Sequence, residues 1–280
     1  MSNAQEVLME LETFFEQFEL LADAPNGVQK LRELILQLAV QGKLVPQNPD
    51  DEPASVLLER IREEKKRLVK EGKIKKGKKL PPIDVDEMPF ELPYGWEWVR
   101  FDSVATIQSN LVKPESYSNY PHIAPDKIEK GTGRLLDCNT IQEDGVTSPK
   151  HFFFSGQILY SKIRPNLSKA VVIDFEGLCS ADMYPIKAYI YTRYLHFYIL
   201  TGTFLELVVG YDNRLAIPKV NQQQLNNTVV PVPPLPEQHR IVAKVDRLMS
   251  FCDELEAKLT QSISDREKLM ETAVRQVLVA

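Results

Sequence analysis

The 280-residue sequence lacks the segments that mark membrane and secreted proteins. No apolar run approaches the roughly 20 residues that a bilayer-spanning helix requires. The first residues, MSNAQEVLMELE, are acidic where a signal peptide is basic. The three cysteines, Cys138, Cys179 and Cys252, are odd in number and show no CxxC spacing. We therefore expect reduced thiols in a cytoplasmic protein that does not bind a membrane.

The sequence also lacks the motifs of the common enzyme classes. It has no GxxxxGK[ST] phosphate loop and no Asn/Asp-Pro-Pro-aromatic tetrapeptide of the kind methyltransferases use. The four histidines stand far apart, and none has a second His or Cys at metal-ligand spacing. Pro125-Asp126 is not followed by the acid-x-Lys of a nuclease, and Gly131-Thr-Gly133 is a turn without the context of a dinucleotide loop. We expect no catalytic residue, metal or cofactor on this chain.

Charge is unevenly distributed along the chain. The net charge of −5 argues against indiscriminate binding of nucleic acid. Residues 62–79, REEKKRLVKEGKIKKGKK, nevertheless carry ten basic and three acidic side chains. This basic run either contacts phosphate non-specifically or forms a solvated helix end and linker. Its interleaved acids and its glycines favour the linker.

Residues 1–92 are predicted to be a helical segment followed by this basic linker. Apolar residues recur at helical spacing from Val7 to Leu21 and again from Val28 to Leu38, where Gly42 ends the second helix. Ser55 is expected to cap a third helix through VLLERIREEKKRLVKE. Residues 72–89 then have the composition of a linker.

Residues 93–235 are predicted to form an α+β globular domain of short strands and a few helices. Short runs such as WEWVRF, HFFFSG, QILYSKI and AVVIDF are rich in β-forming residues and are separated by Gly, Asn, Asp and Pro. One segment of this part, residues 193–211, has a helix-like apolar period. The fold class is therefore α+β, with a globular domain flanked by helical stems.

Residues 236–280 are predicted to form one long helix of coiled-coil type. The proline-rich segment VVPVPPLPEQ leads into it, and Pro236 suits the first turn of a helix. At 1.5 Å per residue the helix would be roughly 65 Å long, so it requires a partner helix. The partner is either a second rod or the N-terminal helices. The apolar seam that we expect at a subunit interface comprises Ile241, Val245, Leu248, Cys252, Leu255, Leu259 and Leu269.

Three polar stretches of the globular domain are candidate DNA-binding loops. Arginine reads guanine edges, Asn and Gln read adenine edges, and Lys and Tyr typically contact phosphates. The alternative is that these loops are merely polar and that the domain is an adaptor that binds a protein. The expected DNA contacts are Lys113, Tyr117, Lys127, Lys130, Lys162, Arg164, Asn166, Lys169, Asn213, Arg214, Lys219 and Asn221.

The sequence resembles the specificity subunit (HsdS) of type I restriction-modification systems, which act in host defence. The resemblance is carried by LRELILQLAVQGKLVPQNPDDEPASVLLERI, ELPYGWEWVRF, GQILYSKIRPNLSKAVV, NRLAIPKVNQQQL and VPPLPEQHRIVAKVDRLMSFCDELE. It implies that residues 93–235 are a target recognition domain that reads half of a bipartite double-stranded DNA target. It also implies that residues 236–280, with the N-terminal helices, form a conserved spacer that docks the modification methyltransferase subunit.

The same resemblance implies that the chemistry belongs to other subunits. The modification subunit would use S-adenosylmethionine, and the restriction subunit, a translocase and nuclease, would use ATP and Mg²⁺. The family usually has two recognition domains in one chain, and this chain has one. It is therefore expected either to be a half-length subunit that associates with itself through the C-terminal helix, or to hold the first domain and spacer of a longer subunit.

Overall fold

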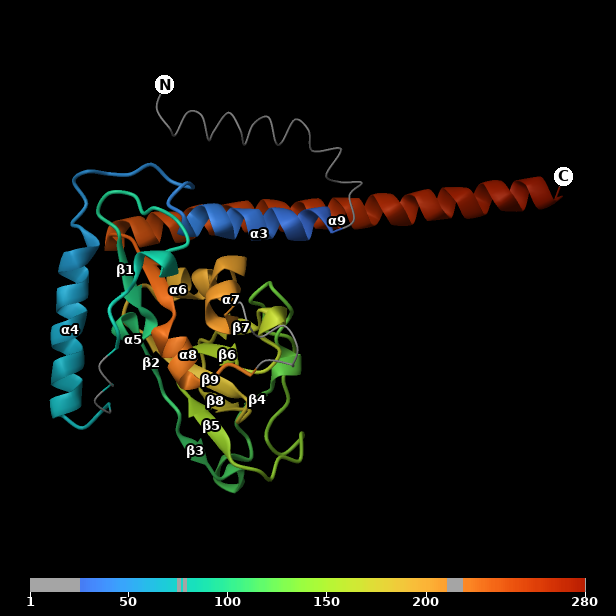
Figure 1. The fold of residues 1–280 in the computed structure, drawn as a ribbon. Helices are drawn as coiled ribbons and strands as arrows, with labels where there is room; N and C mark the ends of the chain where they lie inside the picture. The colour runs from blue at the N-terminus through green and yellow to red at the C-terminus, as the bar shows by residue number, and fades with distance from the viewer. Residues whose placement is uncertain (1–25, 75–76, 78–79, 211–218, 280) are drawn as a thin grey trace.

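The structure is a computed structural model that describes residues 26–74, 77, 80–210 and 219–279. A globular α+β domain hangs from a stem formed by helices α3 (Gly27–Val40) and α9 (Leu235–Val279), as Figure 1 shows. Helix α4 (Ala54–Lys70) runs down one side of the domain. This arrangement confirms the predicted fold class and the long C-terminal helix. The first predicted helix, from Val7 to Leu21, lies outside the described residues.

The second and third predicted helices of the N-terminal segment are present as α3 and α4. Helix α3 ends where expected, because Gly42 adopts a left-handed conformation with φ 69° and the N–H of Lys43 closes the last turn on the Leu38 carbonyl at 2.9 Å. The predicted cap of α4 by Ser55 is wrong. The cap position is held by Pro53 in extended backbone, and the N–H of the buried Ala54 instead donates to the Gly95 carbonyl at 2.8 Å.

The domain contains two four-stranded sheets that share a core. In the first sheet all neighbours are antiparallel, and in the second only the β4–β8 pair is parallel. Phe153, Leu159 and Met183 are fully buried in the cluster between them. The order of the first sheet is β2 (Ala105–Ile107), β9 (Met183–Ala188), β6 (Ile158–Ser161), β7 (Ala170–Val172), and that of the second is β3 (Leu111–Val112), β5 (Lys150–Phe153), β8 (Gly177–Cys179), β4 (His122–Ile123).

The chain enters and leaves the domain at one place beside the stem. Strand β1 (Glu97–Arg100) pairs antiparallel with β10 (Val229–Val232), and Trp98 lies opposite Pro231. The predicted boundaries at residues 93 and 235 lie just outside this pair. The remaining elements are α5 (Phe101–Val104), α6 (Thr192–Ile199), α7 (Gly202–Val209), α8 (Gln222–Asn227) and the 3₁₀ turns η1 (Val85–Glu87), η2 (Pro114–Tyr117), η3 (Pro125–Lys127) and η4 (Pro165–Leu167).

The helix-like segment at 193–211 is two helices, α6 and α7, instead of one. Thr201 separates them, because its hydroxyl accepts a hydrogen bond from the Phe204 N–H at 3.1 Å and so begins a new helix. Tyr194 and Tyr198 of α6 are fully buried and donate their hydroxyls to the carbonyls of Pro231 and Val229, at 2.9 and 2.6 Å. Helix α6 thereby holds β10 against the stem.

Two buried polar side chains fix the start of α9. Glu237 is 1% exposed and accepts hydrogen bonds from Trp96 Nε1 at 3.0 Å and Gln47 Nε2 at 2.9 Å. Burial raises the pKa of its carboxyl group. Gln238, also buried, accepts from the Tyr191 N–H and donates to the Pro233 carbonyl, both at 2.9 Å. The Pro-Glu-Gln segment therefore joins the domain, the α3–α4 connection and the long helix.

The two halves of α9 differ in what covers them. In the first half Ile241, Val245 and Leu248 are buried in one core cluster with α3 and α6. In the second half Leu269 is 70% and Met270 69% exposed. Of the two expected partners of this rod, the N-terminal helix α3 covers its first half, together with α6 of the domain, which lies directly beneath the stem.

Candidate nucleic-acid interface

The Asp182 cluster is a group of basic side chains where β6 ends and β9 begins. Lys162 directly follows β6, and its backbone N–H donates to the Asp182 carbonyl at 3.0 Å. The Lys162 carbonyl accepts from the Val220 N–H at 2.8 Å, which brings in a segment distant in sequence. Lys219 of that segment pairs with the Asp182 carboxylate, Nζ to Oδ1 3.0 Å. Two predicted DNA contacts, Lys162 and Lys219, are thus brought together.

Positive charge predominates in this cluster. Burial lowers the pKa of Lys162, and the nearby charge of Lys219 lowers it further. The Lys162 Nζ lies 5.1 Å from the centre of the Tyr184 ring, a cation–π contact. His151 is buried, and burial and then the charge of Lys162 lower its pKa; its Nδ1 has no hydrogen-bond partner among the described residues. A bound anion would relieve the repulsion between these groups, so the cluster suits a phosphate or a base-edge acceptor.

Residues 163–169 form a tight loop beside the cluster. Arg164 has φ 49° and Ser168 φ 43°, a left-handed conformation that is uncommon for non-glycine residues and concentrates at functional sites. The 3₁₀ turn between them is closed by Leu167 N–H donating to the Arg164 carbonyl at 2.9 Å. Arg164 and Asn166 are exposed, and their side chains have no partner in the part of the chain that the structure describes. Both are therefore free to contact a ligand.

Two predicted contacts have side chains that already hold the fold together. Lys169 donates its Nζ to the Pro125 carbonyl at 2.7 Å, which ties the loop to η3. The Asn221 side chain caps α8, accepting from the Gln224 N–H at 2.9 Å, while the Gln224 side chain accepts from the Asn221 N–H at 2.9 Å. A role for either residue in DNA binding stays a prediction.

Four further predicted contacts that the structure describes lie between residues 113 and 130. Lys113 is exposed at the far end of the domain, and Tyr117 packs its ring 5.4 Å from the ring centre of Phe152. Lys127 is half-buried in η3, and Lys130 is exposed on the next turn. Asn213 and Arg214 lie outside the described residues. Among the ten predicted residues that the structure describes, it joins Lys162 and Lys219 but connects neither of them to these four by a hydrogen bond or ion pair.

The predicted interface seam on α9 is divided into a part that is buried within the chain and a part that is exposed. Ile241, Val245, Leu248 and Cys252 are buried inside the chain, between α9, α3 and α6. Leu255 and Leu259 are half-buried, whereas Leu269 is exposed. The first four residues therefore form an interface within the chain, and only the distal part of the seam is open to a second chain.

Arg100 is an important residue that sequence patterns did not reveal. Its guanidinium is buried and binds both Glu87 oxygens at 2.7 and 2.6 Å. It also donates to the carbonyls of Pro82 and Asn227, each at 2.7 Å. Arg100 thereby anchors the end of the predicted linker to the domain. Its place at the end of a strand, WEWVR, does not distinguish it from an exposed arginine.

No three His, Cys, Asp or Glu side chains in the described part of the chain lie close enough together to hold a metal ion. No helix in the described ranges is long and apolar enough to cross a membrane.

An α+β domain carried on a long helical stem, with basic loops and a cation cluster at strand ends, defines a recognition module mounted on a spacer. Comparison with known proteins gives the family. Residues 93–265 match the family described as "Type I restriction modification DNA specificity domain". The chain belongs to this family, which confirms the resemblance.

Two relatives from Escherichia coli are similar over most of the chain. The chain is 39% identical to the type I restriction enzyme EcoDI specificity subunit over 246 residues, covering 87% of this chain and 51% of that protein. It is 36% identical to the EcoAI specificity subunit over 259 residues, covering 88% of this chain and 44% of that protein. The chain spans about half the length of the curated relatives it matches. These names agree with the expectation of a targeting subunit.

Solved structures share the fold. The HsdS subunit from Thermoanaerobacter tengcongensis has a TM-score of 0.55 and 27% identity, over 68% of this chain and 51% of that one. A chain from a study of assembly and conformational transition of the type I restriction-modification system has a TM-score of 0.51 over 95% of this chain. At 16% identity the second likeness concerns the fold alone.

Proposed function

We propose that this chain is a specificity component of a type I restriction-modification complex and reads one half of a bipartite double-stranded DNA target. The observation that carries the proposal is the Asp182 cluster. Lys162, Arg164 and Lys219 come from two segments and lie side by side on a domain whose basic and acidic residues are equal in number, so positive charge gathered here leaves the rest of the domain net acidic. Lysines here suit phosphates, and the free guanidinium of Arg164 suits a guanine edge.

The chain directs chemistry that other subunits perform. A modification subunit using S-adenosylmethionine and a restriction subunit using ATP and Mg²⁺ supply methylation and cleavage, and this chain binds none of these cofactors. The exposed apolar residues of distal α9, Ile263, Leu269 and Met270, support docking of the modification subunit or of a second copy of the chain. A second copy would bring a second reader and complete the bipartite target.

The test uses duplexes selected by the purified chain from a randomised library, with affinity followed by fluorescence anisotropy. Arg164→Ala should weaken binding to the selected duplex by about 5- to 150-fold and relax the preference at one base pair. Lys162→Ala should weaken all duplexes alike and reduce the slope of log affinity against log salt by about 0.9. Lys187→Ala, an exposed lysine elsewhere on β9, is the matched control and should change neither.

Two results would contradict the proposal. One is wild-type affinity in both Lys162→Ala and Arg164→Ala. The other is binding that does not weaken with salt, because counterion release accompanies every phosphate contact. The second result would favour an adaptor that binds protein.

A further inference from the structure

The turn at residues 129–134 projects from the recognition domain toward the stem. It is closed by the Glu129 N–H, which donates to the Arg134 carbonyl at 3.0 Å, and by a bridge between Ile128 and Leu135. The Thr132 hydroxyl donates to the Glu129 carboxylate at 2.6 Å. The Gly-Thr-Gly sequence was expected to form a turn, and these hydrogen bonds hold that turn in a defined conformation.

Its two glycines allow the turn to lie against the stem. Gly133 has φ 72°, and a Cβ there would lie 2.5 Å from His196 Cε1 of α6, far inside van der Waals contact. A Cβ on Gly131 would lie 3.2 Å from Gln29 Nε2 of α3. The turn thus lies close to two helices, and at Gly133 the approach to α6 is closer than a side chain would allow.

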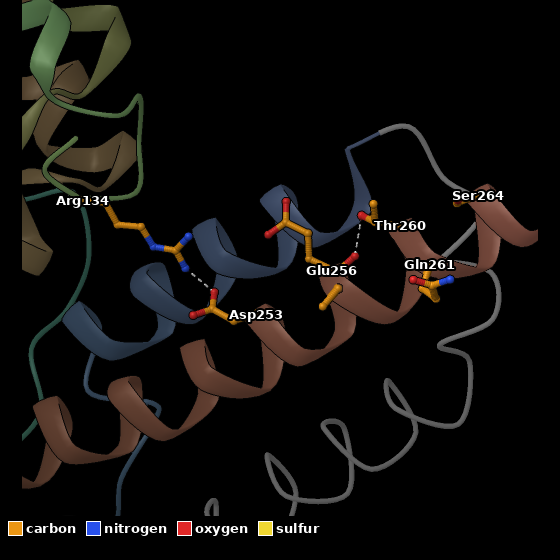
Figure 2. Close-up of a pocket in the computed structure, with 7 residues that line it drawn as sticks. Arg134, Asp253, Glu256, Thr260, Gln261 and Ser264 are labelled. Atoms are coloured by element: carbon orange, nitrogen blue, oxygen red, sulfur yellow. Dashed lines mark hydrogen bonds and ion pairs between the residues drawn. The ribbon is translucent and has the colours of Figure 1, made fainter. Parts of the chain in front are cut away.

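An ion network completes this contact on α9. Arg134 binds Asp253 Oδ1, as Figure 2 shows, and the same oxygen accepts from Arg32 Nη2 of α3 at 2.6 Å. Arg32, whose side chain is 9% exposed, also binds Glu256 Oε2 at 3.0 Å. Burial opposes ionisation of Asp253, but the bonds and charges of Arg32 and Arg134 outweigh it and lower its pKa. One carboxylate therefore links the domain, α3 and α9.

The network lies far from the first attachment of the domain. The β1–β10 pair and Glu237 join the domain to the start of α9, and the Arg193–Asp246 ion pair joins α6 to the first third of α9. Asp253 lies further along the rod, about 27 Å from Leu235 at 1.5 Å per residue. The domain is therefore attached to the rod at two separated places, near Leu235 and at Asp253. The second attachment opposes rotation of the domain about the first.

We propose that Arg134 is a positioning residue that fixes the angle of the recognition domain on the rod. Resting on the proposed function, it thereby sets which spacing between two half-targets is accepted. Arg134 belongs to the domain, and its side chain reaches Asp253 on α9 (Figure 2). Arg134 can therefore control the spacing of the two half-targets without touching DNA. Specificity for spacing would then depend on this contact as well as on the length of the rod.

The first test measures the angle directly, without DNA. Nitroxide labels are placed at Ser155 on the domain and Lys258 on α9, both exposed, with the half-buried Cys138 replaced by serine. Pulsed electron paramagnetic resonance should give one narrow distance distribution. Arg134→Glu adds a third carboxylate beside Asp253 and Glu256, so repulsion replaces attraction and the distribution should broaden or shift.

Three further variants make this result specific. Arg134→Lys keeps the charge and should restore the narrow distribution, and Arg134→Ala should broaden it only partly. Arg67→Glu is the matched control, because Arg67 is also an exposed arginine in an ion pair, but it pairs within α4 with Glu64. A distribution that Arg134→Glu and Arg134→Ala leave unchanged would overturn the proposal, as would equal broadening by Arg67→Glu.

The second test measures spacing with duplexes that carry two selected half-targets at different separations. Arg134→Glu should reduce the preference for the selected spacing by about fivefold, the effect of an exposed ion pair on a two-position equilibrium. Affinity for a single half-target should stay within about twofold, since a positioning residue does not touch DNA. Loss of that single-site affinity would overturn the positioning role. Failure of the wild type to bind any duplex would overturn the proposed function. The role of Arg134 in fixing the angle of the domain would then be decided by the distance measurement, which uses no DNA.

Discussion

Stability of the protein below neutral pH should depend on one buried histidine. His196 of α6 is buried against the domain, and its Nε2 lies 3.0 Å from the Ala170 carbonyl, which can only accept, so Nε2 carries the proton. Burial lowers the pKa of His196 to about 4 from its ordinary value of 6.5, with a smaller contribution from the charge of Arg193. The folded protein therefore keeps His196 neutral where the unfolded chain protonates it.

The size of the effect follows from these two values. Stability is full above pH 6.5 and is lost as the pH falls toward 4, because protons bind the unfolded chain first. Linkage gives a loss of about 2 kcal/mol at pH 5 and about 3 kcal/mol at pH 4. Glu237 acts in the opposite direction, since burial raises its pKa and protonation then favours the folded state. Glu237 is present in both the wild type and a His196 variant, so its contribution cancels in the difference between their free energies of unfolding.

The assay is urea unfolding of the wild type and His196→Gln at pH 7.5 and pH 5. Glutamine can still donate to the Ala170 carbonyl but does not titrate, so the gap in unfolding free energy between the two proteins should narrow by about 2 kcal/mol at pH 5. His239→Gln replaces an exposed histidine and should keep the full pH dependence of the wild type. A gap that is the same at both pH values would refute the reasoning.

Three more substitutions test the packing by urea unfolding. Gly133→Ala should destabilise the fold by about 2–4 kcal/mol, because it adds a clash with α6 to left-handed strain, whereas Gly145→Ala, also left-handed but in open space, should cost only about 1 kcal/mol. Ile241→Ala should cost about 2–5 kcal/mol through a cavity, and Leu269→Ala should cost almost nothing. Arg100→Met should cost about 2–3 kcal/mol, because it leaves three carbonyls and a carboxylate without their donor.

Patterns that repeat along the chain were predictable from the sequence. The apolar period from Val28 to Leu38 and the one beginning at Ile241 both correspond to helices, because each buries one stripe. The α+β nature of the domain followed from short runs of β-branched and aromatic residues between turn residues. The seam of α9 was visible too, but its partner was not, because a stripe of apolar residues does not say whether its cover comes from the same chain.

The functional residues were only partly predictable, because their roles depend on pairings between distant segments. Lys162 and Lys219 were each selected as polar loop residues, yet only the fold places both beside Asp182. Asn221 has a residue type that reads adenine, but its side chain caps a helix, which depends on where α8 begins. Arg134 lies in a stretch selected for DNA contact and is turned to the stem instead.

The distribution of buried charge connects recognition to the rod. Arg32, Arg100 and Glu237 are all buried charged groups, and each joins segments that lie far apart in the sequence. Buried ionic groups add little net stability, since desolvation offsets their attraction, but they penalise any arrangement that leaves them unpaired. A recognition domain whose half-target must lie at a fixed distance from a second half-target requires a single orientation on the rod. Extra stability is less important for that task. On this reasoning, replacing these groups with apolar residues would preserve the fold more readily than it would preserve the angle between domain and rod.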